Sequence, residues 1–309
     1  MDLRLLRYFI AVAEEGHITR AAERLGMQQP PLSQQIKILE RELGVQLFRR
    51  KPRGVELTDA GRAFLGEARE IFTKFDHAVD TARRASRGEL GKLSIGISST
   101  AHFIPLVPRL IREFRESYPQ VSIDLQEAGS SELIELARLG QLDIVFIRKL
   151  FAPVPGLAAM HLLDESMVVA LPSTHALAPR KTIPLKALSE EIFITYRRPE
   201  GPGLSDVIEA ACHAAGFSLR SGQEAPRPAS ALNLVAAGNG ICIVPASLQR
   251  MQLDGVLYRP LASGSQLKAP LHLISRRNDG SPVLRNFLKM VARMPKSSMA
   301  SGHPLYSTI

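Results

Sequence analysis

Apolar positions recur with a helical period in two short stretches near the start of the chain, and a tight turn joins them. The first stretch has a small apolar face, and Gly26 ends it because glycine tolerates a positive φ. The second stretch begins at Pro30 and Pro31, a helix start where a missing N–H costs little. Its buried stripe is predicted at Leu32, Ile36, Leu39 and Leu43.

The opposite face of the second predicted helix is polar and rich in hydrogen-bonding groups. A helix that enters the major groove of DNA needs such a face, because base edges are recognised there by hydrogen bonds. The alternative is an amphipathic helical hairpin whose outer face is only solvated. We assign the groove-facing positions to Gln29, Pro30, Pro31, Ser33, Gln34 and Lys37.

A basic turn follows this helical pair and favours the DNA-binding interpretation. Residues 45–58 have the pattern of two short strands around a turn with proline and glycine. The five residues 49–53 include four cations and no acid, which suits contact with phosphates or with a narrow minor groove. We predict DNA contacts from Arg50 and Arg53. Thr19 is expected to cap the helix that precedes the recognition helix and to contact a phosphate.

A long helical pattern covers residues 58–88. Its apolar positions are spaced by three and four residues, close to a heptad repeat, and charged residues flank them. The helix either packs on its own domain or pairs with the same helix of a second subunit, and its place between two domains favours the pairing. Such a dimer carries two recognition helices and is expected to bind an interrupted palindrome. The predicted seam consists of Phe64, Ala68, Ile71, Phe75 and Ala78.

Strands and helices alternate from Lys92 onward, which is typical of a parallel sheet with right-handed crossovers. The first strands are predicted at 93–97, 121–125 and 142–147, with helices over 104–117 and 131–139. A long apolar strand over 160–171 leads into a second alternating region. That region has strands predicted at 192–195 and 241–245 and helices at 204–215 and 229–237. A returning strand at 270–276 and a helix at 282–293 complete the pattern.

The composition is that of an ordinary globular protein, with 45% hydrophobic and 22% charged residues among 309. A net charge of +9 favours an acidic partner such as nucleic acid. No signal peptide and no run of about 18 apolar residues occurs, so we expect a cytoplasmic protein without membrane contact. No paired acids, activated nucleophile or cofactor loop supports an enzyme, and the eight histidines form no metal-ligand cluster.

The motifs of residues 1–60 together resemble the winged helix-turn-helix of the LysR-type transcriptional regulators. The resemblance rests on Thr19–Ala22, Gln29–Ser33, Leu47–Arg49 and Leu57–Gly61. The downstream region also fits this family, and the chain looks most like its muconate-sensing regulators of aromatic-compound catabolism. The resemblance implies a two-lobed α/β effector domain similar to periplasmic binding proteins, control by a small-molecule effector without a cofactor, a homotetramer arranged as a dimer of dimers, and RNA polymerase as a partner. A transport-type binding protein is disfavoured by the attached DNA-binding module.

This family organisation predicts four segments along the chain. They are a DNA-binding domain over 1–60, a linker helix and hinge over 61–90, an effector domain over 91–296 and a disordered tail over 297–309. Within the effector domain, lobe one is expected at 92–163 and 268–296, and lobe two at 164–267.

An effector site is expected where strand ends meet helix starts, because open α/β lobes bind ligands there. Hydroxyl groups, free backbone N–H groups and an arginine at a strand end suit a carboxylate. The resemblance adds that Thr100, Ser130 and the Gly203–Leu204 turn match positions where muconate-sensing relatives hold their effector. The alternatives are ordinary helix caps and, for the arginine, a salt bridge. The predicted effector-binding residues are Ser99, Thr100, Gly129, Ser130, Arg148, Gly203 and Leu204.

Cys212 and Cys242 are the only two cysteines. Neither has cationic or metal-binding neighbours in the sequence, so two buried thiols are the simplest prediction. A redox switch, as in peroxide-sensing members of the LysR family, is the alternative, and it requires the two thiols to approach each other.

Overall fold

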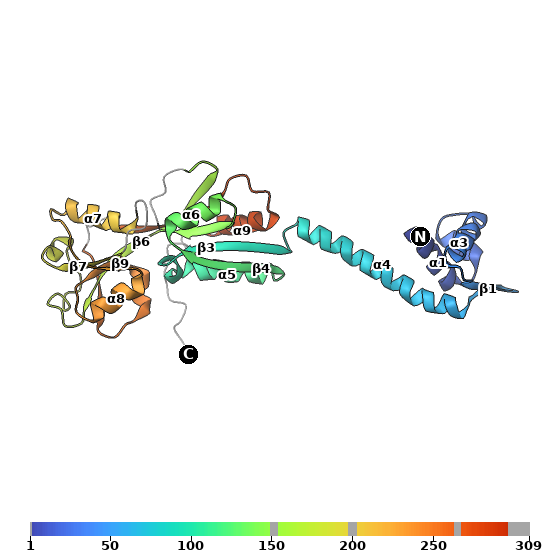
Figure 1. Ribbon diagram of the computed structural model, residues 1–309, viewed down its shortest axis with the longest axis horizontal. Helices are drawn as coiled ribbons and strands as arrows, with labels where there is room; N and C mark the ends of the chain where they lie inside the picture. The colour runs from blue at the N-terminus through green and yellow to red at the C-terminus, as the bar shows by residue number, and fades with distance from the viewer. Residues whose placement is uncertain (1, 149–153, 197–202, 263–266, 296–309) are drawn as a thin grey trace. The chain divides into compact units, whose positions relative to one another are not determined.

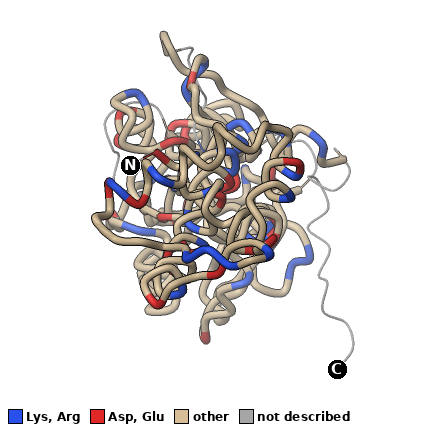
Figure 2. The backbone as a smooth tube through the Cα atoms, turned by 90° about the vertical axis from the view of Figure 1, so that its right-hand side faces the viewer, with Lys and Arg blue, Asp and Glu red and all other residues tan. Residues whose placement is uncertain are grey.

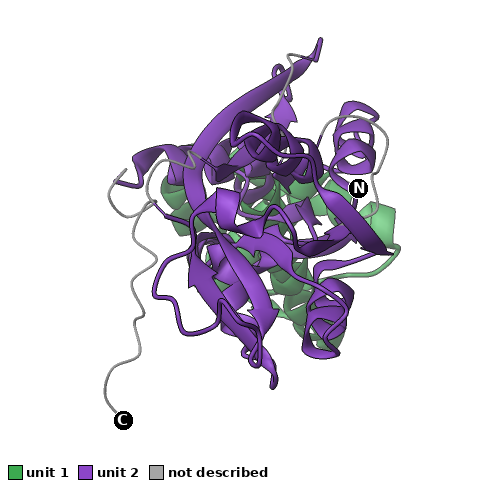
Figure 3. Cartoon of the chain, turned by 90° about the vertical axis from the view of Figure 1, so that its left-hand side faces the viewer, with its two compact units in different colours: residues 1–83 green, residues 84–309 purple. Residues whose placement is uncertain are grey.

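The computed structural model describes residues 2–148, 154–196, 203–262 and 267–295. The chain divides into two compact units, residues 1–83 and 84–309 (Figure 3). The tail predicted at 297–309 lies outside the described residues. Within the described part of the chain, no helix is long and apolar enough to cross a membrane.

The first unit is a small helical domain with a two-stranded hairpin, as predicted (Figure 1). Phe9 lies fully buried at its centre and its ring contacts those of Phe48 and Phe64, with centroids 5.3 and 5.2 Å away. The predicted stripe of the recognition helix is confirmed, since Leu32 and Leu39 are completely buried. The elements are α1 (Leu3–Glu15), α2 (Ile18–Arg24), α3 (Gln29–Leu43), β1 (Phe48–Lys51), β2 (Gly54–Leu57) and α4 (Asp59–Ser86), whose last residues belong to the second unit.

The hairpin is held against the end of α1 by a close backbone approach. Gly54 has a φ of +133°, and a Cβ atom there would lie 2.3 Å from the carbonyl oxygen of Gly16. The N–H of Val55 donates to that same oxygen at 2.9 Å. Only glycine fits this position, because any side chain would push the hairpin off the domain.

The first turns of the long helix α4 pack on the first unit, whereas its middle part is exposed. Thr58 caps its start, since its Oγ1 accepts from the N–H of Gly61 at 3.0 Å. Phe64 and Ala68 then pack into the core of the first unit, where Ala68 is completely buried. This corrects the predicted dimer seam at these two positions, because the first turns of α4 are needed to cover their own domain. Ile71, Phe75 and Ala78 are exposed.

Lobe one of the second unit is a sheet with helices on both faces, in which the predicted parallel strands are joined by an antiparallel returning strand, β11 (Lys268–Arg276). β3 lies between β4 and β5 and is parallel to both. α5 and α9 share a core with one face of this sheet, and α6 packs on the other face. The elements are β3 (Gly91–Ser98), η1 (Ala101–Phe103), α5 (Leu106–Ser117), β4 (Val121–Ala128), α6 (Ser130–Arg138), β5 (Ile144–Ile147) and α9 (Pro282–Arg293).

Two long strands carry the chain between the lobes. β6 (Leu157–Pro172) pairs with β11 (Lys268–Arg276) along its first part, from Leu157 to Ser166. From Met167 to Pro172 it pairs instead with β9 (Cys242–Pro245) and β10 (Val256–Pro260) of lobe two. The same strand therefore belongs to both lobes, which confirms the predicted two-lobed architecture.

Lobe two has helices on opposite faces of its sheet. α7 packs with Phe193 and Ile243 on one face, and α8 packs with Ile194 and Val244 on the other. The sequence did not predict two strands of this lobe, β8 and β10. The remaining elements are η2 (Leu185–Leu188), β7 (Ile192–Tyr196), α7 (Leu204–Ala214), β8 (Arg220–Ala225), α8 (Pro228–Ala236) and η3 (Ala246–Met251).

Candidate functional site

The outer face of α3 presents the polar side chains that the sequence predicts. The face opposite the buried stripe is open to solvent at Pro30, Pro31, Gln34 and Lys37, whereas Gln29 and Ser33 are half-buried. Pro30 and Pro31 stand in the first turn, where their missing N–H groups cost little. The structure thus provides an accessible helix face with amide, hydroxyl and ammonium groups that suits contact with base edges.

The hairpin after α3 carries four cations, and an acid on the opposite strand neutralises two of them. Glu56 on β2 forms ion pairs with Arg49 and Lys51 on β1. Within the described residues, Arg50 and Arg53 have no such partner and are exposed. Figure 2 shows cations and acids interspersed along the backbone. Net charge alone therefore does not identify a phosphate-binding surface, whereas two exposed arginines without an acidic partner in the described part of the chain, Arg50 and Arg53, favour phosphate contact at the hairpin.

Thr19 does not cap the helix α2, contrary to the prediction. The helix begins at Ile18, and the imidazole Nδ1 of His17 accepts from the N–H of Thr19 at 3.2 Å. The aromatic nitrogen of His17 therefore caps the helix. Thr19 lies one residue into the first turn with an exposed side chain.

A buried acid that the sequence analysis missed connects α3 to the hairpin. The carboxylate of Glu40, 9% exposed, accepts from the backbone N–H groups of Leu47 and Phe48 at 2.9 and 3.1 Å. These bonds fix the direction in which the chain leaves α3. They therefore set the position of the hairpin relative to the polar helix face.

In the second unit, the carboxyl end of β3 combines with the start of α6. Ser98 is 5% exposed, and its hydroxyl has no hydrogen-bond partner among the residues that the structure describes. Its side chain lies on the sheet face that α6 covers, because Ile97 points into the opposite core and side chains alternate along a strand. Ser98 also pairs with Ala128, two residues before α6 begins at Ser130. The predicted residues Ser99, Thr100, Gly129 and Ser130 directly follow this pair of positions in the sequence, whereas Ser98 itself was not among the predicted residues.

The structure contradicts the predicted effector role of Arg148. Its side chain is 2% exposed and forms an ion pair with Glu165 on the crossover strand β6. It also donates to Ser247 Oγ at 3.2 Å and to the carbonyl of Ala269 at 3.4 Å. The anionic partner that this arginine requires is thus supplied by the protein itself, and the salt bridge that the sequence left open is the correct interpretation.

The Gly203–Leu204 turn, also predicted to bind the effector, makes its contacts with other residues of lobe two. The backbone N–H of Gly203 donates to the carboxylate of Asp206 at 2.5 Å, so the first turn of α7 is already capped by an acid. Leu204 packs against the apolar core of lobe two. The geometry therefore does not support the predicted grip of this turn on a carboxylate.

An exposed ion pair joins the two lobes near the carboxyl end of β4, on the sheet face opposite Ser98, because Glu127 pairs with Ile97. Glu127, near the end of β4, accepts from Arg227, the residue before α8, at 2.7 Å. His102 of η1 lies 3.7 Å from the same carboxylate. Glu127 thus holds a cation of lobe two against lobe one.

The two cysteines lie on opposite faces of the sheet of lobe two. Cys212, on α7, packs in the cluster that includes Ile243, whereas Cys242, on β9, belongs to the cluster of α8. Burial, with a smaller contribution from the charge of Glu209, raises the pKa of Cys212 to about 11. A switch that joins these thiols is not favoured, because the sheet separates two buried groups. The described residues contain no group of three or more histidine, cysteine or acidic side chains arranged for a metal.

Comparisons with known proteins match both units. The LysR substrate binding domain matches residues 86–295, and the bacterial regulatory helix-turn-helix protein, lysR family, matches residues 3–62. The chain is 38% identical over 291 residues to the transcriptional regulator AlsR of Bacillus subtilis (strain 168), which covers 93% of the chain and 94% of AlsR. It is 36% identical over 293 residues to the regulator BudR of Raoultella terrigena, with coverages of 94% and 100%.

A solved structure agrees with this assignment. Full-length CbnR complexed with its target DNA has a TM-score of 0.83 and 32% identity, and the match covers 95% of this chain and 99% of that one. Together with the polar helix, the cationic hairpin and the two-lobed domain, these matches establish what kind of protein this is. The chain belongs to the LysR family of transcriptional regulators, which bind DNA through a helix-turn-helix and respond to small molecules through a substrate-binding domain, and which are not enzymes.

Proposed function

We propose that the effector of this regulator is a small carboxylate that binds between the lobes, at the carboxyl end of β3 and the start of α6. The observation that carries the proposal is the buried, unpartnered hydroxyl of Ser98. A buried polar group without a partner costs free energy, and a ligand that accepts from it removes that cost.

The surroundings of Ser98 favour an anion. Gly129, at the cap position of α6, has no side chain to accept from the N–H groups of the first turn. These groups and the helix dipole attract negative charge. The hydroxyls of Ser99, Thr100 and Ser130 add donors around the same point, so a carboxylate here needs no arginine.

Effector binding controls DNA binding only if it favours one arrangement of the lobes over the other. The pair of Glu127 with Arg227 gives a physical route, because it joins the two lobes and a change in their arrangement would strengthen or break it. The ligand would then act on this contact through the position of the lobes and not by touching it.

On DNA, we propose that the face of α3 enters the major groove and that the hairpin contacts phosphate. A dimer through Ile71, Phe75 and Ala78 of α4 would bind an interrupted palindrome, and two dimers would form the tetramer. Contact with RNA polymerase would then transmit the response. The assigned DNA contacts are Thr19, Gln29, Pro30, Pro31, Ser33, Gln34, Lys37, Arg50 and Arg53.

Thermal unfolding of the full chain against a panel of mono- and dicarboxylates tests the effector proposal. A ligand at about 100 times its Kd stabilises the folded state by about 2.7 kcal/mol, which gives a clear rise in Tm. The Ser98→Ala variant should bind the same acid about tenfold more weakly, since a hydrogen bond to a charged group is lost.

The control is Ser117→Ala, an exposed serine at the end of α5, which should respond as the parent does. Equal stabilisation of the parent and Ser98→Ala would move the site away from β3. No response to any acid would show that the effector is not a carboxylate.

A further inference from the structure

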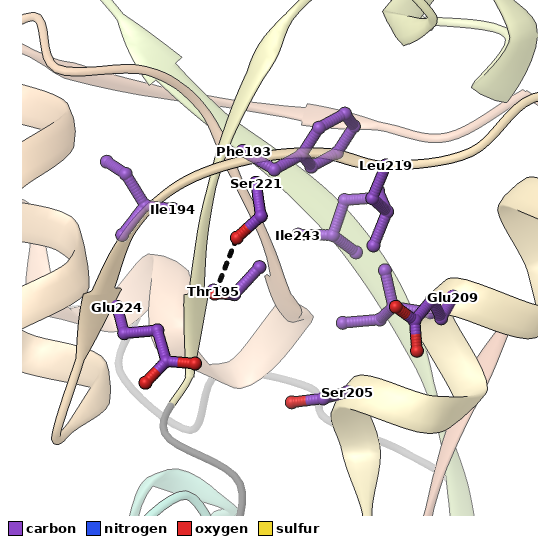
Figure 4. Close-up of a pocket in the computed structure, with 10 residues that line it drawn as sticks. Phe193, Ile194, Thr195, Ser205, Glu209, Leu219, Ser221, Glu224 and Ile243 are labelled. Atoms are coloured by element: carbon purple, nitrogen blue, oxygen red, sulfur yellow. Dashed lines mark hydrogen bonds between the residues drawn. The ribbon is translucent and has the colours of Figure 1, made fainter.

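A pocket lies within lobe two, between α7 and the strands β7 and β8 (Figure 4). Its volume is about 320 Å³, within the range of sites that hold small molecules. It shares no lining residue with the carboxylate site proposed above. The side chains that line this pocket therefore determine its ligand independently of that site.

The inner wall of the pocket is apolar. Phe193 and Ile243 project from the sheet, and Ile208 and Leu219 complete the wall from α7 and the segment before β8. Phe193 and Ile208 are also part of the buried core of lobe two, so this wall is fixed in place by packing. Such a surface is suited to a compact hydrocarbon or aromatic group.

Hydroxyl groups line the middle of the pocket. The Oγ1 atom of Thr195 lies 3.4 Å from the Oγ atom of Ser221 on the neighbouring strand. Ser205 faces them from the first turn of α7 (Figure 4). Hydroxyls both donate and accept, so they accommodate a polar head group of either sign. They do not by themselves decide the charge of a ligand.

Two carboxylates in the lining favour a positively charged ligand. Glu224 of β8 and Glu209 of α7 stand on opposite sides of Thr195 and Ser205 in Figure 4, and the described lining includes no lysine or arginine. Glu209 has other interactions, so the argument rests on Glu224, whose carboxylate makes no hydrogen bond or ion pair with the described residues. The adjacent helix start does not offer an anion site, because Asp206 already caps it.

We propose that this pocket binds a small primary ammonium compound with an apolar body. The ammonium group would donate to Glu224 and to the hydroxyls, and the hydrocarbon part would cover Phe193 and Ile208. Because the pocket adjoins α7 and β7, such a ligand would give the regulator an input that is independent of a carboxylate between the lobes.

The test is thermal unfolding of the full chain with n-butylammonium, cyclohexylmethylammonium and 2-phenylethylammonium chlorides, each compared with the alcohol of the same skeleton. At least one amine should raise the Tm in a saturable way, and its alcohol should act more weakly. Glu224→Gln should weaken binding of that amine severalfold, up to about fivefold, because Glu224 is exposed and solvent screens its attraction for the ammonium group. Ser221→Leu, which fills the pocket, should abolish the response.

Glu132→Gln is the matched control, because it removes an exposed carboxylate from α6 of lobe one. It should bind the amine as the parent does. The proposal fails if no amine stabilises the parent, if the alcohols act as strongly as the amines, or if Glu132→Gln and Glu224→Gln behave alike. Ser98→Ala should leave the amine response unchanged, so failure of the carboxylate proposal and failure of this one are distinguishable.

Discussion

At the scale of single residues, the hairpin cations should differ in their effect on DNA binding. Arg53 has no acidic partner, whereas Arg49 is already neutralised by Glu56. Arg53→Ala should therefore weaken DNA binding and reduce the slope of log K against log salt concentration by about one, the effect of one lost phosphate contact. Arg49→Ala should change both quantities less. Titration of each variant with an operator fragment over a range of KCl concentrations measures the difference, and equal slopes for the two variants would contradict the assignment.

Individual side chains were predictable from the sequence where their role is local. The exposed face of α3 follows from helical spacing alone, and so does the buried stripe opposite it. The partners of Arg49 and Arg148 were not predictable. Glu56 meets Arg49 through strand pairing, and Glu165 meets Arg148 only in the folded lobe, since the two are 17 residues apart. Ser98 was missed for a related reason, since only the folded sheet shows that its hydroxyl is buried without an acceptor.

At the scale of elements, the exposed part of α4 should carry the dimer contact. Ile71 and Phe75 are one helical turn apart and are 37% and 48% exposed, which is unusual for large apolar side chains on a charged helix. Phe75→Asp should shift the full chain toward monomers, because it places a charge in the apolar seam. Thr73→Asp, which adds the same charge at a neighbouring exposed position outside this seam, should not. Sedimentation velocity measures both, and an unchanged dimer in Phe75→Asp would exclude this seam.

Elements with strong periodicity were predicted to within a few residues, as for α7, α9 and β6. The missed strands, β8 and β10, lack that signal. Five of the six residues of β8 are exposed and its sequence, Arg220–Ala225, has no alternation of apolar and polar positions. The strand exists because parallel pairing with β7 satisfies its backbone, which a single sequence does not reveal.

At the scale of the whole molecule, alternation of strands and helices predicted both lobes and the crossover between them. It did not predict what fixes the lobes to one another. The junction includes Arg148 directly after β5, Glu165 from β6 and Ser247 from η3, and the N–H of Ser247 also donates to Glu165. These residues are distant in sequence and meet only because β6 passes from one lobe into the other.

This junction predicts a large and specific effect on stability. Arg148→Ala leaves the carboxylate of Glu165, 14% exposed, without its cation, and loss of one partner of a buried pair costs about 3–5 kcal/mol. The midpoint of urea unfolding of the second unit should fall accordingly. Arg138→Ala, which breaks an exposed pair with Glu135, should leave the midpoint nearly unchanged.

The double variant Arg148→Met, Glu165→Leu separates the loss of the pair from the burial of a lone charge. Replacing a buried ion pair by apolar side chains of similar size is often neutral for stability, so the double variant should be more stable than Arg148→Ala. If instead both are equally unstable, the hydrogen bonds to Ser247 and Ala269 hold the lobes together, and the charge pair is secondary. If Arg148→Ala behaves like Arg138→Ala, this cluster does not fix the lobes, and Arg148 becomes available again as a ligand-binding residue.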